Sequence, residues 1–127
     1  LEETDVRWLG KHPRYGSIEA GKFPRGEALK QTVERVVPYF QTEIMPKITA
    51  GRRLLIAAHG NSLRALVKYL DAISDEDIIK YYIPTGIPLV FEFDEEMKPT
   101  KSYYLGDQEA IKAAQEAVAN QGKAKQV

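Results

Sequence analysis

The feature that most constrains the fold is a short apolar run, Leu54–Ala58, which leads directly into His59-Gly60-Asn61-Ser62. Such a run is typical of a strand buried on both faces of a parallel sheet, so we expect a strand over about 53–58. Asn61 and Ser62 favour the start of a helix. Apolar residues then recur at three- and four-residue steps. They predict a helix over about 62–71 with the inward face Leu63, Leu66, Val67 and Leu70.

His59 would therefore lie at the carboxyl end of a strand and just before a helix N-terminus. Ligands of open α/β sheets bind beyond the carboxyl ends of the strands, and helix N-termini favour phosphate. Gly60 lets a ligand approach the backbone closely because it has no Cβ. The alternative interpretation is that His59 is a buried histidine with satisfied hydrogen bonds and that Gly60 is only a turn residue.

The composition excludes several classes of function. The 127 residues suffice for one domain, and 18 basic and 18 acidic side chains give a formal net charge of zero. No nucleic-acid or membrane partner is therefore indicated. The absence of cysteine excludes disulfides and thiolate chemistry and agrees with a cytoplasmic protein. Only two histidines, 47 positions apart, and no cysteine are present, so no zinc site is expected, and no pattern in the sequence indicates a site for another metal.

The first part of the chain, residues 1–26, is rich in glycine and proline and is expected to be an irregular loop. His12 lies in this loop and is interpreted as a surface histidine. Residues 21–26 have the glycine spacing of a P-loop but lack its lysine and its serine or threonine, so that motif is rejected. The chain starts at Leu1, which suggests a start inside a longer protein; removal of a few residues or of a tag is the alternative.

A helix is predicted from Glu27 onward, with Pro38 kinking or splitting it and with Pro46 and Gly51 marking its end. Its apolar stripe is Leu29, Val33, Val36, Phe40 and Ile44. A further helix over 75–82 is expected after the N-cap residue Ser74.

Strands over 89–93 and 101–105 are predicted to form a hairpin with a longer loop that contains Pro99. Asp107 can cap a last helix over 108–119, with Ile111, Ala114 and Val118 inward. The tail, residues 120–127, has no periodicity and is either a mobile terminus or a lid over an anionic ligand. The expected fold class is α/β, with a core over 27–119: a mostly parallel sheet with helices on both faces and an antiparallel edge strand.

Two further features follow His59 in the sequence. Residues 60–64 resemble a serine hydrolase elbow, but Arg64 replaces its last glycine and no later histidine is present, so a hydrolase is rejected. Arg64 opposes the helix dipole, which is consistent with an anionic neighbour. The alternatives are that Arg64 forms a buried ion pair or that it is solvated.

Several segments together resemble the cofactor-dependent phosphoglycerate mutases of the histidine phosphatase superfamily. Residues 57–70, which contain His59-Gly60-Asn61-Ser62, are similar to that family's second histidine motif. Residues 83–90 resemble its next segment, and residues 5–15 resemble its mid-chain loop. The family's ending is matched by residues 103–107 and 118–125. The resemblance covers nearly the whole chain.

The resemblance implies a single phosphoglycerate mutase-like domain of which residues 1–127 are the C-terminal portion. The parent protein would be a cytoplasmic isomerase of glycolysis and gluconeogenesis that interconverts 3-phosphoglycerate and 2-phosphoglycerate. It would be primed by 2,3-bisphosphoglycerate through a phosphohistidine, without a metal. His59 would stabilise the transferring phosphoryl group, and Gly60 and Asn61 would bind substrate.

The family's Arg-His-Gly-Glu motif, whose histidine takes up the phosphoryl group, is absent from this sequence. The N-terminal half of the enzyme would therefore be a required partner, and this chain alone is expected to be inactive. The parent is expected to be a homodimer or a homotetramer. The alternatives are a bisphosphoglycerate mutase or phosphatase of the same superfamily and a non-catalytic α/β binding module.

Overall fold

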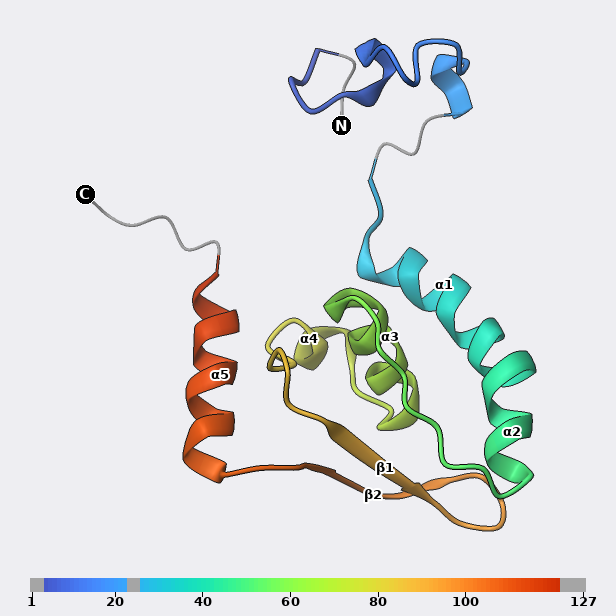
Figure 1. Ribbon diagram of the computed structural model, residues 1–127, viewed down its shortest axis with the longest axis vertical. Helices are drawn as coiled ribbons and strands as arrows, with labels where there is room; N and C mark the ends of the chain where they lie inside the picture. The colour runs from blue at the N-terminus through green and yellow to red at the C-terminus, as the bar shows by residue number, and fades with distance from the viewer. Residues whose placement is uncertain (1–3, 23–25, 122–127) are drawn as a thin grey trace.

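The computed structural model of the protein describes residues 4–22 and 26–121. It is a mixed helix and strand structure with one antiparallel sheet of two strands. Figure 1 shows the helices α1 (Leu29–Tyr39) and α2 (Met45–Thr49) along one side of the molecule and α5 (Gln108–Asn120) along the other. Helix α3 (Gly60–Leu70) lies between these sides, and the strands cross below it.

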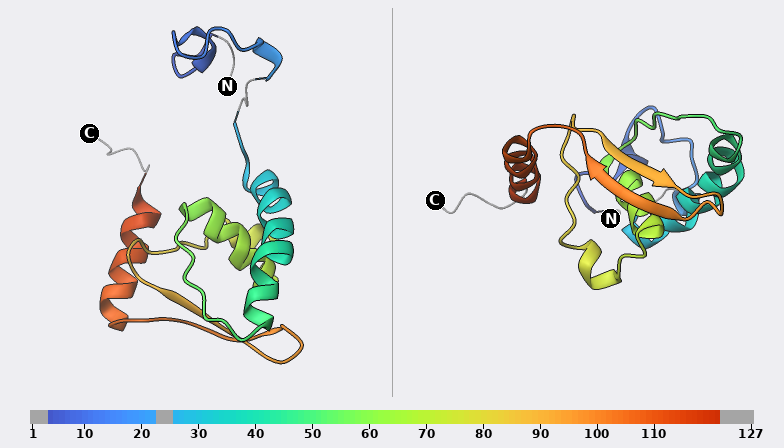
Figure 2. Two further views of the ribbon diagram at one scale, coloured as in Figure 1. Left: turned by 45° about the vertical axis from the view of Figure 1, so that its right-hand side comes forward. Right: turned by 90° about the horizontal axis from the view of Figure 1, so that it is seen from below.

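Residues 4–22 form turns and two short 3-10 helices, Leu9–Lys11 and Ala20–Lys22. They lie beyond the N-terminal end of α1, apart from the remaining elements (Figure 2). Trp8 is nonetheless 8% exposed, because its indole ring covers the backbone at Gly10. A Cβ at position 10 would approach the Trp8 Nε1 atom to 2.5 Å. The segment therefore has its own local packing but no strand and no long helix.

The predicted helix after Glu27 is present and ends just before Gly51, as expected. Helix α1 passes through a π-helical turn, Phe40–Ile44, into α2. The π-helical turn begins two residues after Pro38, which has no N–H to donate the regular hydrogen bond of an α-helix. The predicted break in regular helix geometry at Pro38 is therefore confirmed. Pro46 does not end the helix, because it lies in the first turn of α2 where a missing N–H costs nothing.

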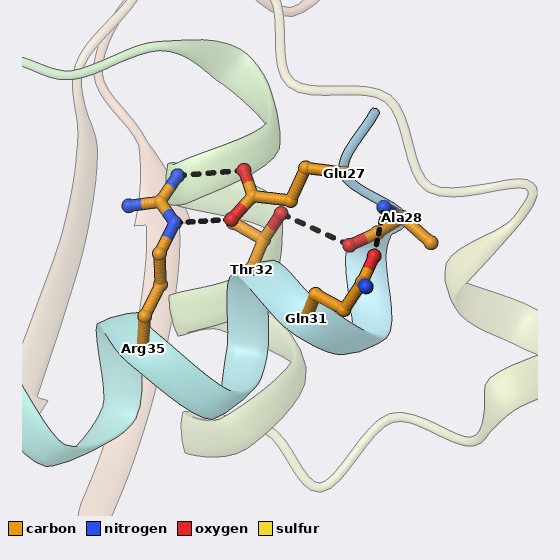
Figure 3. Close-up of polar contacts among 5 residues, drawn as sticks. All are labelled: Glu27, Ala28, Gln31, Thr32 and Arg35. Carbon is orange, nitrogen blue, oxygen red and sulfur yellow. Dashed lines mark hydrogen bonds and ion pairs between the residues drawn. The ribbon is translucent and has the colours of Figure 1, made fainter. Parts of the chain in front are cut away.

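The beginning of α1 is held by side chains that replace a regular cap (Figure 3). The Gln31 Oε1 atom accepts a hydrogen bond from the Ala28 N–H at 2.8 Å, and the Thr32 hydroxyl donates to the Ala28 carbonyl at 3.2 Å. Arg35 donates to both carboxylate oxygens of Glu27, from Nε to Oε1 and from Nη2 to Oε2 at 2.9 Å. This arginine lowers the pKa of the Glu27 carboxyl. These contacts fix where the chain enters α1.

Helices α1 and α3 pack against each other and form the main apolar core. Its most buried members are Thr32, Phe40, Ala65 and Val67. The Phe40 ring meets Tyr69 edge-on at 6.3 Å between centroids, and the Tyr69 hydroxyl accepts a hydrogen bond from Gln41 at 2.9 Å. The predicted stripe of α1 therefore faces α3, although Leu63, Leu66 and Leu70 of the predicted α3 face are only half-buried.

The predicted hairpin is confirmed. Strands β1 (Leu89–Phe93) and β2 (Pro99–Tyr104) pair antiparallel, with Leu89 opposite Tyr104 and Phe91 opposite Ser102. The register shifts between Glu92 and Phe93, which brings Pro99 into the first position of β2 instead of the loop. A strand can begin with proline because no ladder N–H is needed there.

The predicted strand over 53–58 is wrong for this chain. These residues run without regular structure from the end of α2 to the start of α3 (Figure 1). Their side chains are exposed, 41% for Leu54, 91% for Leu55 and 37% for Ile56. A parallel strand needs a neighbouring strand with free backbone groups. Among the described residues only β1 and β2 exist, and they pair with each other, so the predicted mostly parallel sheet is not formed.

The helix α4 (Asp75–Ile78) is shorter than the predicted 75–82. Ser74 caps it as expected, since its hydroxyl accepts from the Asp77 N–H at 3.0 Å. The helix stops because the Ile78 carbonyl is already bound by the Tyr81 N–H at 3.2 Å and by the Arg64 side chain at 2.5 Å. At the other end of the chain, α5 begins at the predicted cap, Asp107, and residues 122–127 of the expected tail lie outside the described residues.

Candidate functional site

The candidate site is the first turn of α3, where His59 is the N-cap residue and Gly60 and Asn61 are the first two helical residues. The His59 backbone is extended (φ −64°, ψ 145°), and the helix begins immediately after it. The prediction that Asn61 or Ser62 caps this helix is therefore wrong. The imidazole Nδ1 atom of His59 takes that role by accepting a hydrogen bond from the Asn61 N–H at 3.3 Å.

This cap determines which nitrogen of His59 carries the proton. A nitrogen that accepts from an N–H group cannot itself be protonated, so the neutral imidazole holds its proton on Nε2. His59 is exposed, and its Nε2–H group is therefore a hydrogen-bond donor available to a ligand. The alternative prediction of a buried, satisfied histidine does not describe this side chain.

The backbone of the same turn presents further donors. The Leu63 N–H binds the His59 carbonyl at 3.0 Å and the Asn61 N–H binds the His59 ring. For the N–H groups of Gly60 and Ser62, no acceptor lies among the residues that the structure describes. A Cβ built on Gly60 meets no heavy atom within 4 Å, so the space beside its backbone is open. The turn thus combines free donors, open space and the positive end of an 11-residue helix.

Arg64 contributes a positive charge to this turn. Its Nη2 atom donates to the Ile78 carbonyl at 2.5 Å, and its Nη1 atom lies 3.4 Å from the Asn61 Oδ1 atom. The guanidinium forms no ion pair with any described residue. The structure therefore places Arg64 between helices as a hydrogen-bond donor, and neither a buried ion pair nor a fully solvated arginine is correct.

Lys68, one turn further along α3, was not singled out by the sequence analysis. Its ammonium group donates to the Ile73 carbonyl at 2.6 Å and pairs with Asp75 at 2.8 Å. Lys68 lowers the pKa of the Asp75 carboxyl. Arg64 and Lys68 are four residues apart in the helix, so their side chains lie on the same face of α3. This spacing, shortly before the Ser74 cap, was the sequence signal that both side chains face the segment that follows α3.

The other candidate features of the sequence do not join this site. The His12 Nδ1 atom accepts from the Arg14 N–H at 3.2 Å within residues 4–22. In the described part of the chain, no three side chains of the types that bind metals are grouped around a common point. None of its helices has the length and apolar character needed to cross a bilayer.

The chemistry that this arrangement supports is the binding of an anionic oxygen. Exposed donors come from the His59 ring and the backbone of the first turn, and the helix and Arg64 add positive charge. No carboxylate lies in the first turn of α3 to oppose an anion. A comparison with models of known protein families finds no match for this sequence.

Proposed function

We propose that this chain is the C-terminal portion of a cytoplasmic, 2,3-bisphosphoglycerate-dependent phosphoglycerate mutase, in which His59, Gly60 and Asn61 bind the transferring phosphoryl group. The observation that carries the proposal is the first turn of α3, where His59 has its Nε2–H free and the Gly60 N–H has no acceptor among the described residues. The choice of phosphoglycerates over other anions rests on the resemblance of residues 57–70, 83–90 and 118–125 to that family.

The donors of this turn fit a phosphate group in both charge and geometry. A phosphoryl group in transfer spreads negative charge over its oxygens, and donors already oriented toward those oxygens stabilise it without reorganisation. His59 is oriented by its hydrogen bond from Asn61, and Gly60 leaves room for an oxygen to reach its N–H. When bound, 2,3-bisphosphoglycerate supplies the phosphoryl group that primes the enzyme. The histidine that accepts it is not in this sequence.

The parent enzyme is proposed to contain the mostly parallel sheet that is not formed here, with residues 53–58 as one of its strands. This segment supports the idea because residues 54–58 are apolar and yet exposed, with Leu55 91% exposed. A strand from the N-terminal half would bind its backbone groups and cover its side chains. Amide hydrogen exchange tests this: we expect residues 54–58 to exchange rapidly in the 127-residue chain and slowly in the full-length protein. Rapid exchange in both would contradict the proposal.

The role of His59 is tested in the full-length protein by measuring conversion of 3-phosphoglycerate to 2-phosphoglycerate. Because His59 is also the N-cap of α3, its replacement by alanine would remove a cap worth about 1 kcal/mol. His59→Asn is the sharper variant, since asparagine can cap the helix but has no imidazole. We expect His59→Asn to lower kcat by about 100-fold or more while thermal unfolding changes little.

His12→Asn is the matched control, because it removes the other histidine of the chain at a position outside the site. It should leave kcat unchanged. Full activity of His59→Asn would show that His59 has only a structural role, and no conversion of 3-phosphoglycerate by the unmodified full-length protein would favour the non-catalytic binding module. Release of inorganic phosphate, or formation of 2,3-bisphosphoglycerate as the main product of the unmodified protein, would favour the phosphatase or bisphosphoglycerate mutase of the same superfamily.

A further inference from the structure

We propose that Arg64 is a positioning residue that holds the Asn61 side-chain amide with its NH₂ group free to donate to the substrate's phosphate. The inference rests on the proposed function of the first turn of α3 and adds a residue to which the resemblance assigns no role. It follows from the two contacts of the Arg64 guanidinium, one to Asn61 and one to Ile78.

The orientation of the Asn61 amide follows from the chemistry of arginine. Guanidinium nitrogens only donate hydrogen bonds, so the amide atom that faces Arg64 Nη1, at 3.4 Å, must be the oxygen. The NH₂ group of Asn61 then points away from Arg64. With its oxygen turned toward Arg64, the amide presents its two N–H donors on the opposite side, which suits a phosphate oxygen.

The position of Arg64 is in turn fixed from outside α3. Its Nη2 atom binds the carbonyl of Ile78, the last residue of α4, at 2.5 Å. Ile78 is 4% exposed and the neighbouring Ala65 is fully buried, so this end of the guanidinium lies against packed structure. The Arg64 Nε atom is buried and has no partner among the described residues. The two Nη contacts therefore determine the placement of the guanidinium, even though one of its donors stays unsatisfied.

Lys68 provides a matched control from the same helix. It also joins α3 to the segment before and within α4, through the Ile73 carbonyl at 2.6 Å and Asp75 at 2.8 Å. Neither contact involves Asn61. Loss of Lys68 therefore removes a comparable link between α3 and α4 and leaves the Asn61 amide held. A difference between the Arg64 and Lys68 variants would report on Asn61 and not on the link between the helices.

The test is a double-mutant cycle in the full-length protein. Its readouts are the affinity for 3-phosphoglycerate, measured as Kd, the steady-state kinetics with the same substrate, and thermal unfolding. Arg64→Met is expected to raise Kd about tenfold when Asn61 is present and less than about twofold in an Asn61→Ala background. Lys68→Met should lower the unfolding temperature and change Kd by less than about twofold in either background. Should Arg64→Met fail to fold, Arg64→Lys replaces it, because an ammonium lacks the planar fork that reaches two acceptors.

Each outcome decides a stated question. If Arg64→Met raises Kd by the same factor with and without Asn61, or not at all, Arg64 does not act through Asn61 and the inference is overturned. If Lys68→Met raises Kd as much as Arg64→Met does, the link between the helices is responsible, which also overturns it. If the unmodified full-length protein does not bind 3-phosphoglycerate, the proposed function itself fails and takes the inference with it.

Discussion

The replacement of Gly60 by alanine separates ligand binding from folding more cleanly than any other change in this site. Gly60 is the first residue of α3, and a Cβ at this position meets no heavy atom within 4 Å. Alanine also forms helices more readily than glycine, by up to about 1 kcal/mol within a helix and less at its first position. The free energy of unfolding of Gly60→Ala should therefore be unchanged or higher by up to about 1 kcal/mol.

Substrate binding should respond in the opposite direction. The open space beside Gly60 is where a phosphate oxygen would lie to reach its N–H, and a methyl group would occupy part of that space. Loss of one such charge-assisted hydrogen bond is worth about 1.5–3 kcal/mol, which corresponds to a rise in KM of about 10- to 150-fold. We expect Gly60→Ala to be as stable as the unmodified full-length protein and to have a strongly raised KM for the phosphoglycerate substrate.

The assay combines urea unfolding with steady-state kinetics on the full-length protein. Gly21→Ala is the control, because it makes the same exchange at a glycine whose Cβ also meets nothing within 4 Å but which lies outside α3. That variant should leave KM unchanged. An unchanged KM in Gly60→Ala would refute the close approach of substrate to this backbone. A loss of stability above about 1 kcal/mol would refute the structural half of the argument.

The remaining predictions concern the two helix ends at which the chain adopts a left-handed conformation. After α2, Gly51 has φ +78° with open space around its Cβ position, so Gly51→Ala should lower the free energy of unfolding by about 1 kcal/mol in urea titrations. After α3, Ala72 holds the equivalent position with φ +50°, so Ala72→Gly should raise the free energy of unfolding by about 0.5 kcal/mol. Changes of the same sign in both variants would contradict the assignment of strain to φ alone.

Both helix ends use the same hydrogen-bond pattern, which explains why opposite exchanges should have opposite effects. The Arg52 N–H binds the Lys47 carbonyl at 3.1 Å and the Ile73 N–H binds the Lys68 carbonyl at 3.1 Å, each spanning five residues. This is the Schellman arrangement, which requires a left-handed residue just before the donor. Glycine meets that requirement at Gly51, whereas at Ala72 a Cβ must be accommodated.

The helices and the hairpin could be predicted because their signals are local. Ser74 and Asp107 cap helices at the predicted positions, and the apolar stripe of α1 packs on α3. Caps, stripes and turns depend on residues a few positions apart, so a short window of sequence contains the relevant interactions. The turn that places His59 and Gly60 at the start of α3 belongs to the same group.

The details of the candidate site could be predicted only in part. The sequence places His59, Gly60 and Asn61 before a helix, but an imidazole as N-cap was not expected, because Asn61 and Ser62 are the better cap types. The role of Arg64 depends on the Ile78 carbonyl, 14 positions along the chain. No periodic pattern brings these two residues together; the packing of α3 beside α4 does.

The sequence by itself thus determined the local elements: the Ser74 and Asp107 caps, the amphipathic helices, the hairpin and the turn that presents His59 and Gly60. Tertiary structure decided where α4 ends, which atoms Arg64 binds and whether residues 53–58 form a strand. The physical reason is that an apolar run becomes a strand only when another backbone supplies its hydrogen bonds and other side chains cover it. In the described part of this chain no segment does so, and Leu54, Leu55 and Ile56 remain exposed.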